Sequence, residues 1–145
     1  MNDIINKDLV VLDLEASSKE EVIRKLSKLI EKQDKLIDFD GYVKQVFERE
    51  KDFPTSIGFD VAIPHGKSDS VKSAAVAFAR LKKEVKWSEE ESVKYVFLIA
   101  VPEKEAGDRH LQILAQLSRK IMREEFRTKL CEASSIEEIL EALDS

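Results

Sequence analysis

A histidine occupies a constrained position in the segment IPHGKSDSV, residues 63–71. Pro64 fixes its own backbone and biases Ile63 toward an extended conformation, while Gly66 lacks a Cβ where another group could approach closely. The pattern therefore predicts that His65 is held at the end of a short strand. A neutral imidazole nitrogen is a nucleophile near pH 7 and needs no separate base to deprotonate it. The alternative is a turn histidine that only hydrogen-bonds its neighbours.

Two further side chains have the chemistry to assist a nucleophile of this kind. His110 falls in the first turn of a predicted helix, where the positive end of the helix dipole disfavours its protonation. A neutral His110 could donate an N–H to an anion beside His65, although a partly exposed histidine near a helix start is the alternative. Arg49 offers a planar guanidinium that suits phosphate oxygens, and its alternative is a surface ion pair with Glu48 or Glu50.

Small polar residues complete the candidate phosphate-binding set. Thr55 and Ser56 could supply hydroxyl or backbone N–H groups to an anion, or could simply cap a turn. Gly66 leaves room for an anion beside the backbone. The spacing of these residues does not by itself show that folding brings them together.

Length and composition favour one α/β domain over residues 1–145. The chain has 43% hydrophobic and 37% charged residues, a net charge of -5 and no basic stripe, so we expect no nucleic-acid partner. The lone Cys131 excludes an internal disulfide, and the two histidines lie too far apart for a structural zinc site, so no metal is expected. No apolar run is long enough for a membrane span, and we expect a cytoplasmic protein. Cys131 is expected to be a small, partly buried residue.

Hydrophobic periodicity predicts the elements that position these residues. Ser18 and Glu21 form a capping-box pattern at the start of a helix, and a second amphipathic helix runs to about residue 50. The last predicted helix is capped by Ser134 or Ser135. Strands are expected at 9–12, 61–63, 74–81 and 94–102, with a short edge strand around residue 87, and later helices at 107–121, 124–132 and 136–143. In the first of these later helices, Leu111, Leu114, Leu117 and Ile121 are predicted to face inward. The order predicts a mixed, mostly parallel sheet flanked by helices on both faces.

Two long segments carry a family resemblance. REKDFPTSIGFDVAIPHGKSDSVKSAAVAFARL, residues 49–81, resembles the IIA domain of the fructose/mannitol family of the bacterial phosphoenolpyruvate-dependent sugar phosphotransferase system. VFLIAVPEKEAGDRHLQILAQLSRKIMREEFRTKL, residues 96–130, is similar to the second signature of that family. Several separated motifs match in the right order, and the resemblance covers essentially the whole chain.

The resemblance implies a phosphoryl relay. It assigns to His65 the histidine that is phosphorylated by the phosphocarrier HPr and that passes the group to a cysteine of a IIB domain. It places His110 next to His65 and gives Arg49 the role of stabilising the transferring group. It implies no cofactor, no direct sugar binding, and only an indirect, transient association with the membrane IIC component.

The sequence departs from the family in the loop before His65. Many members carry glycine where this chain has Ser56 and Asp60, and Phe59 is a gain. We expect these changes to alter the loop backbone and an apolar docking rim that includes Ile57, Phe59 or Phe53.

Two other functions are compatible with the residues. One is a regulatory, nitrogen-type IIA protein whose phosphorylation controls partner binding. The other is a small-ligand binding domain without phosphoryl transfer. The segments AIPHGKSDSVK and AVAFARL look more like the sugar branch of the family, which favours transport.

Overall fold

The computed structural model describes residues 3–105 and 107–144. Its strands are β1 (Val10–Leu14), β2 (Val61–Ala62), β3 (His65–Ser68), β4 (Ala75–Lys86) and β5 (Ser92–Pro102). Its helices are α1 (Lys19–Lys32), α2 (Phe39–Asp52), α3 (Asp108–Ile121), α4 (Glu124–Glu132) and α5 (Ile136–Asp144), with short 3₁₀ turns at Lys7–Leu9 and Glu103–Glu105.

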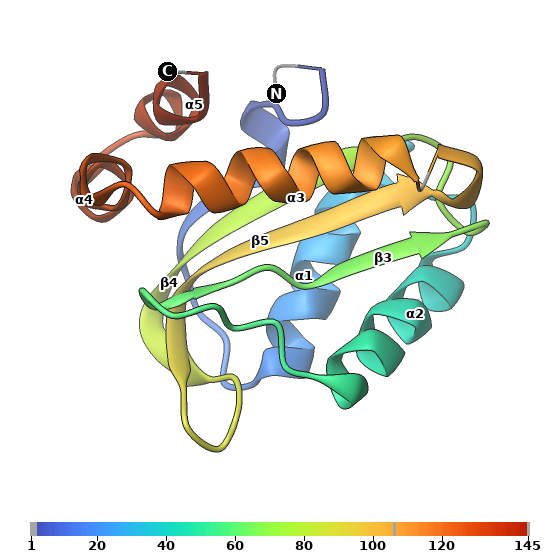
Figure 1. Cartoon of the computed structure of the whole chain (residues 1–145), viewed down its shortest axis with the longest axis horizontal. Helices are drawn as coiled ribbons and strands as arrows, with labels where there is room; N and C mark the ends of the chain where they lie inside the picture. Colours follow the sequence, from blue (N-terminus) through green and yellow to red (C-terminus); the bar gives the residue numbers. More distant parts are fainter. Residues whose placement is uncertain (1–2, 106, 145) are drawn as a thin grey trace.

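The strands form one mixed sheet in which β4 and β5 are the centre (Figure 1). β4 and β5 pair antiparallel, whereas β1 pairs parallel with β4, and both β2 and β3 pair parallel with β5. The long apolar runs of β4 and β5 are buried because the sheet is covered on both faces. The predicted mixed, mostly parallel α/β sheet is therefore confirmed.

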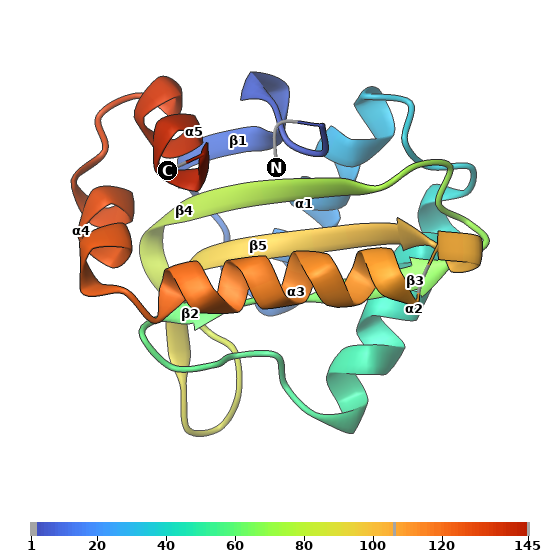
Figure 2. The same ribbon diagram turned by 45° about the horizontal axis from the view of Figure 1, so that its top comes forward.

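Helices cover both faces of this sheet. α1 and α2 pack against each other; in Figure 1, α1 passes behind the strands, α2 lies beside β3, and α3 crosses in front of β5. Figure 2 shows the same two layers after rotation, with α4 and α5 following α3 and α5 lying beside β1. Ile113, Leu117 and Ile121 form the buried side of α3.

No helix in the described part of the chain combines the length and the apolar character that a bilayer span requires.

Side-chain caps fix two helix starts. The hydroxyl of Ser18 accepts the backbone N–H of Glu21 at 3.1 Å, as the sequence predicts for α1. The carboxylate of Glu21 reaches back to Ser17 rather than to Ser18, so the reciprocal half of the capping box is displaced by one residue. At α5 the cap is Ser135, whose hydroxyl accepts the N–H of Glu138 at 3.2 Å.

The strand that begins at His65 escaped prediction because its four residues, HGKS, carry no apolar alternation. Gly66 and Ser68 face inward in β3, and the side chains of α2 fill the space that their small size leaves. A Cβ on Gly66 would lie 3.1 Å from Val46 Cγ2 and 3.2 Å from Tyr42 Cε1. Gly66 is therefore needed because helix α2 approaches the backbone closely at this position.

Three other expectations were wrong in detail. Leu111 is 65% exposed, because the buried face of α3 runs through positions 110, 113, 117 and 121, and Leu111 is rotated away from it. No separate strand surrounds Trp87, which instead follows directly on an extended β4 and is buried. Cys131 is exposed, because α4 buries Phe126 and Leu130 on its inner side.

We predict that Gly66→Ala lowers the free energy of unfolding by about 1–3 kcal/mol through overpacking against two fully buried side chains. Urea denaturation measures this loss. Gly107→Ala is the matched control, because nothing lies within 4 Å of a Cβ there and the backbone is already helical. Equal stability of both variants would contradict the packing role of Gly66.

Candidate active site

His65 opens strand β3 with a defined hydrogen bond. Its Nδ1 lies 2.9 Å from the carbonyl oxygen of Ile63. Because a carbonyl oxygen can only accept, Nδ1 must carry the hydrogen. The neutral ring then has its lone pair on Nε2, so the nucleophilic atom is the one that the backbone does not hold.

His110 lies beside His65. It is the third residue of α3, its side chain is buried at 8% exposure, and the two ring centroids are 5.0 Å apart with planes at 58°. The described residues provide no hydrogen-bond partner for its Nδ1. The juxtaposition implied by the family resemblance is confirmed, and the alternative of a partly exposed histidine near the helix start is wrong.

Both rings favour the neutral form. Burial lowers the pKa of His65 below its usual value of 6.5, and the positive charges of Arg49 and Lys67 lower it further. The hydrogen bond to Ile63 and the negative charge of Glu50 act in the opposite direction. Burial lowers the pKa of His110 to about 4, with smaller contributions from the charges of neighbouring cationic groups. The expected neutrality of His110 is confirmed, but its principal cause is burial rather than the helix dipole.

Arg49 lies in the last turn of α2, where its Nη1 donates to the carbonyl oxygen of Phe53 at 2.9 Å. Within residues 3–105 and 107–144 it forms no ion pair with Glu48 or Glu50, so the surface-pair alternative is wrong. Its charge acts on the pKa values of both His65 and His110. The structure therefore brings Arg49 and the two histidines into one electrostatic environment.

Thr55 and Ser56 use their polar side chains within the protein. The hydroxyl and the backbone N–H of Thr55 both donate to Glu50, and the hydroxyl of Ser56 donates to Glu91 at 3.1 Å. Gly66 is buried against α2. A phosphate-binding role for Thr55, Ser56 and Gly66 stays a prediction.

Glu50 is a site residue that the sequence interpretation missed. Its side chain is 5% exposed, and its carboxylate accepts hydrogen bonds from Lys19, Thr55 and Trp87. The helical period could have indicated its burial, because position 50 lies on the same face of α2 as the buried Val43 and Val46. A carboxylate at such a position requires hydrogen-bond partners, and this requirement points to a polar network.

Exposed apolar side chains occur in the loop before His65 and beside His110. Phe53 is 74% exposed, and Ile57, Phe59 and Leu111 are exposed as well. Gly58, Phe59 and Asp60 have consecutive positive φ angles of 88°, 57° and 62°. The ring of Phe59 stacks under the guanidinium of Arg127 at 4.1 Å, which helps to hold this unfavourable backbone.

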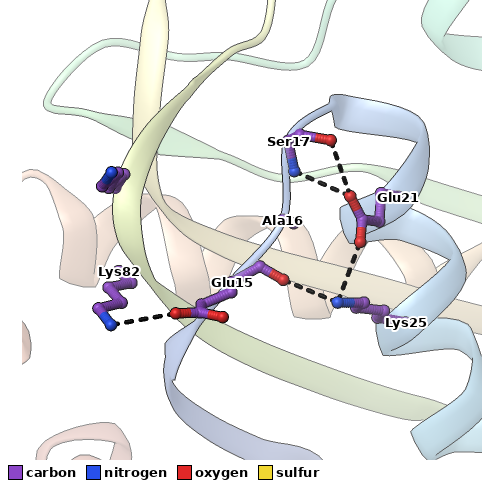
Figure 3. A pocket seen from close by; sticks show the side chains of 7 residues that line it. Glu15, Ala16, Ser17, Glu21, Lys25 and Lys82 are labelled. Atoms are coloured by element: carbon purple, nitrogen blue, oxygen red, sulfur yellow. Dashed lines mark hydrogen bonds and ion pairs between the residues drawn. The ribbon is translucent and has the colours of Figure 1, made fainter.

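A separate cavity of about 470 Å³ lies at the start of α1 and does not include the histidines (Figure 3). Two of its lining lysines already have partners: Lys25 pairs with Glu21 at 3.0 Å and donates to the Glu15 carbonyl at 2.7 Å, and Lys82 pairs with Glu15 at 3.0 Å. Within the described residues, no group of three His, Cys, Asp or Glu side chains is arranged to hold a metal ion.

Residues 3–145 match a protein-family model that is described as phosphoenolpyruvate-dependent sugar phosphotransferase system, EIIA 2. Because the match spans nearly the whole sequence, the chain belongs to this family. The fructose-specific EIIA component of Haloferax volcanii is 36% identical over 94% of this chain and 89% of its own length.

Two longer relatives contain a segment that resembles this chain. The 2-O-alpha-mannosyl-D-glycerate-specific EIIABC component of Escherichia coli is 33% identical over 97% of the chain, and the fructose-specific EIIABC component of Bacillus subtilis is 35% identical over 99%. The chain spans only 22% and 23% of the lengths of these two relatives.

Solved structures share the fold. The nitrogen regulatory protein IIA-Ntr of Neisseria meningitidis superposes with a TM-score of 0.89 at 32% identity, covering 97% of each chain. The IIA mannitol structure of Escherichia coli gives a TM-score of 0.82 at 28% identity, covering 96% of this chain and 98% of the other. The complex of enzyme IIAMTL and phosphorylated enzyme IIBMTL from Escherichia coli gives 0.84 at 27% identity, covering 97% and 96%.

The pKa of His110 predicts how stability depends on pH. The unfolded chain binds a proton at this histidine below about pH 6.5, whereas the native protein does not until about pH 4. The free energy of unfolding should therefore fall as the pH drops from about 6.5 to about 4, and His110 should cause no further loss below that. His110→Asn should show a shallower dependence in urea denaturation series over this range. An unchanged pH slope would contradict the assignment.

Proposed function

We propose that this protein is a phosphocarrier that accepts a phosphoryl group on Nε2 of His65 from phosphorylated HPr and passes it to a cysteine of a IIB domain. The observation that carries the proposal is the hydrogen bond from Nδ1 of His65 to the Ile63 carbonyl, because it leaves the Nε2 lone pair available. Family membership and the paired, buried His110 support the same role.

The phosphoryl transfer requires no separate base, because neutral Nε2 has no hydrogen to lose. The Nε2 lone pair forms a bond to phosphorus as the bond between phosphorus and the donor nitrogen breaks, and the donor ring keeps the released electron pair. The His65 ring becomes cationic because Nδ1 keeps its hydrogen, and the Ile63 carbonyl dipole stabilises that charge. When an attacking IIB thiolate takes the phosphoryl group, the ring returns to its neutral form.

The neighbouring groups fit the charge that develops on the phosphoryl oxygens. The guanidinium of Arg49 is a planar, permanently charged donor, and a neutral His110 can donate one N–H without repelling the cationic His65 ring. The near in-line geometry of phosphoryl transfer makes such positioning the main source of catalysis. The protein itself would supply no cofactor and bind no sugar.

Phosphorylation with phosphoenolpyruvate, Enzyme I and HPr tests the proposal. Wild-type protein should acquire an acid-labile, base-stable phosphate, and His65→Ala should acquire none. Arg49→Ala should keep its circular dichroism spectrum while onward transfer slows by roughly 100-fold, because one stabilising donor is lost. Normal labelling of His65→Ala would overturn the site assignment.

The exposed apolar loop provides a surface on which HPr and IIB domains can dock in turn. A shared, transient surface should be small and apolar at its centre. Phe53→Ser should raise the KM for phosphorylated HPr and leave the maximal rate nearly unchanged. Ile37→Ser is the matched control, because Ile37 is 69% exposed but precedes α2, at the opposite end of that helix from Phe53. Equal KM values for the two variants would contradict docking at the loop.

A regulatory role is the second candidate, and the likeness to the nitrogen regulatory protein of Neisseria meningitidis favours it. Both functions begin with phosphorylation of His65, so labelling does not separate them. The two functions are separated by measuring whether the isolated phosphoprotein transfers its phosphoryl group to IIB domains. In the transport role, the protein works in the cytoplasm and reaches the membrane IIC component only through IIB.

A further inference from the structure

The buried carboxylate of Glu50 has no part in the relay described above, yet it is the centre of a polar network. Its Oε1 accepts from Lys19 Nζ at 3.1 Å, from Trp87 Nε1 at 3.0 Å and from the Thr55 N–H at 3.2 Å. Its Oε2 accepts the hydroxyl of Thr55. The carboxylate thereby connects the start of α1, the turn between β4 and β5, and the loop that leads to His65. A buried charge with this many donors is strongly held in place.

A chain of backbone hydrogen bonds runs from this network to the nucleophile. The carbonyl of Thr55 accepts the N–H of Ile63 at 3.1 Å, and the carbonyl of Ile63 accepts Nδ1–H of His65 at 2.9 Å. Thr55 is 4% exposed and Ile63 is 9% exposed, so bulk water cannot readily replace either hydrogen-bond partner. The position of the Ile63 carbonyl therefore depends on the position of Thr55.

We propose that Glu50 is a positioning residue that, through Thr55 and Ile63, fixes His65 in the tautomer with hydrogen on Nδ1 and the lone pair on Nε2. The benefit for phosphoryl transfer rests on the proposed function, whereas the effect on the tautomer does not. The hydrogen-bonded route from Glu50 to the ring of His65 passes through Thr55 and Ile63.

The electrostatic environment agrees with this role. Burial and the charges of Arg49 and Lys67 lower the pKa of His65, and the negative charge of Glu50 opposes them. The same negative charge favours the cationic ring that forms when Nε2 is phosphorylated. Glu50 thus supports both the ring orientation and the charged product.

Glu50→Gln tests the proposal because it keeps the shape of the side chain and removes its charge and one acceptor. Long-range ¹H–¹⁵N spectra of the unphosphorylated protein report the tautomer of His65. Wild type should show hydrogen predominantly on Nδ1, and Glu50→Gln should show a measurable Nε2–H fraction together with a lower His65 pKa. Transfer from phosphorylated HPr should slow by roughly 10- to 100-fold, as for other residues that orient a reactive group.

Lys19→Met is the matched control, because it removes a donor to the same carboxylate that is not part of the connection through Thr55 and Ile63. It should lower stability and leave the tautomer unchanged. Thr55→Val removes the hydroxyl that donates to Glu50 and leaves the backbone N–H as the one bond between these two residues. It should therefore shift the tautomer in the same direction to a smaller extent, and it serves as the second variant if Glu50→Gln does not fold.

Folded Glu50→Gln with the tautomer of wild type would overturn the proposal, whatever its pKa or transfer rate. A shifted tautomer in Glu50→Gln would support it. If wild-type protein takes no phosphate from HPr, the proposed function fails while the spectra still decide the role of Glu50.

Discussion

The hydrogen bond between Nδ1 of His65 and the Ile63 carbonyl is the interaction on which the proposed chemistry of this protein depends. It decides which nitrogen is nucleophilic, and it gives the ring a dipole that can stabilise positive charge. Burial keeps the ring neutral before reaction, and His110, 5.0 Å away between ring centroids, is neutral for the same reason. Two uncharged rings beside the permanent charge of Arg49 form a site that can receive a dianion.

The scaffold holds this site between a rigid side and an irregular side. On the rigid side, His65 pairs with Ile99 of β5, and the hydroxyl of Tyr42 donates to the Ile99 carbonyl at 2.7 Å. On the irregular side, the loop through Phe59 and Asp60 adopts left-handed backbone conformations that non-glycine residues rarely take. The Asp60 carbonyl accepts backbone N–H groups of β5 at 2.8 and 3.0 Å, which holds this loop against the sheet. The backbone at His65 is thus held by pairing with β5, and the loop before it is held against the same strand.

The sequence predicted most of the fold because its signals are local. Apolar runs define β4 and β5, and the helical period defines α1, α2 and α3. β3 could not be predicted, since His65 to Ser68 become a strand only by pairing with β5 and packing small residues against α2. Leu111 was placed inward because periodicity does not distinguish neighbouring faces of a helix when a histidine occupies the buried position.

The reactive side chains of the candidate site could be predicted from the sequence, but the hydrogen-bond network that surrounds them could not. The types of His65, His110 and Arg49 indicate phosphate chemistry, and the family resemblance indicates that they meet. Thr55 donates to a carboxylate five positions earlier, and that carboxylate is also held by Trp87 from the turn between β4 and β5, so no local pattern reveals these contacts. Tertiary contacts of this kind decide whether a polar group is available to a substrate or already satisfied by the protein.

We propose that Nε2 of His65 is the atom that accepts phosphorus. The most direct test is ¹⁵N and ³¹P spectroscopy of the protein after phosphorylation by HPr, with ¹⁵N-labelled histidine. The structure predicts a phosphorus coupling to Nε2 of His65 and a retained hydrogen on Nδ1. Phosphorus on Nδ1 of His65, or on His110, would contradict the account.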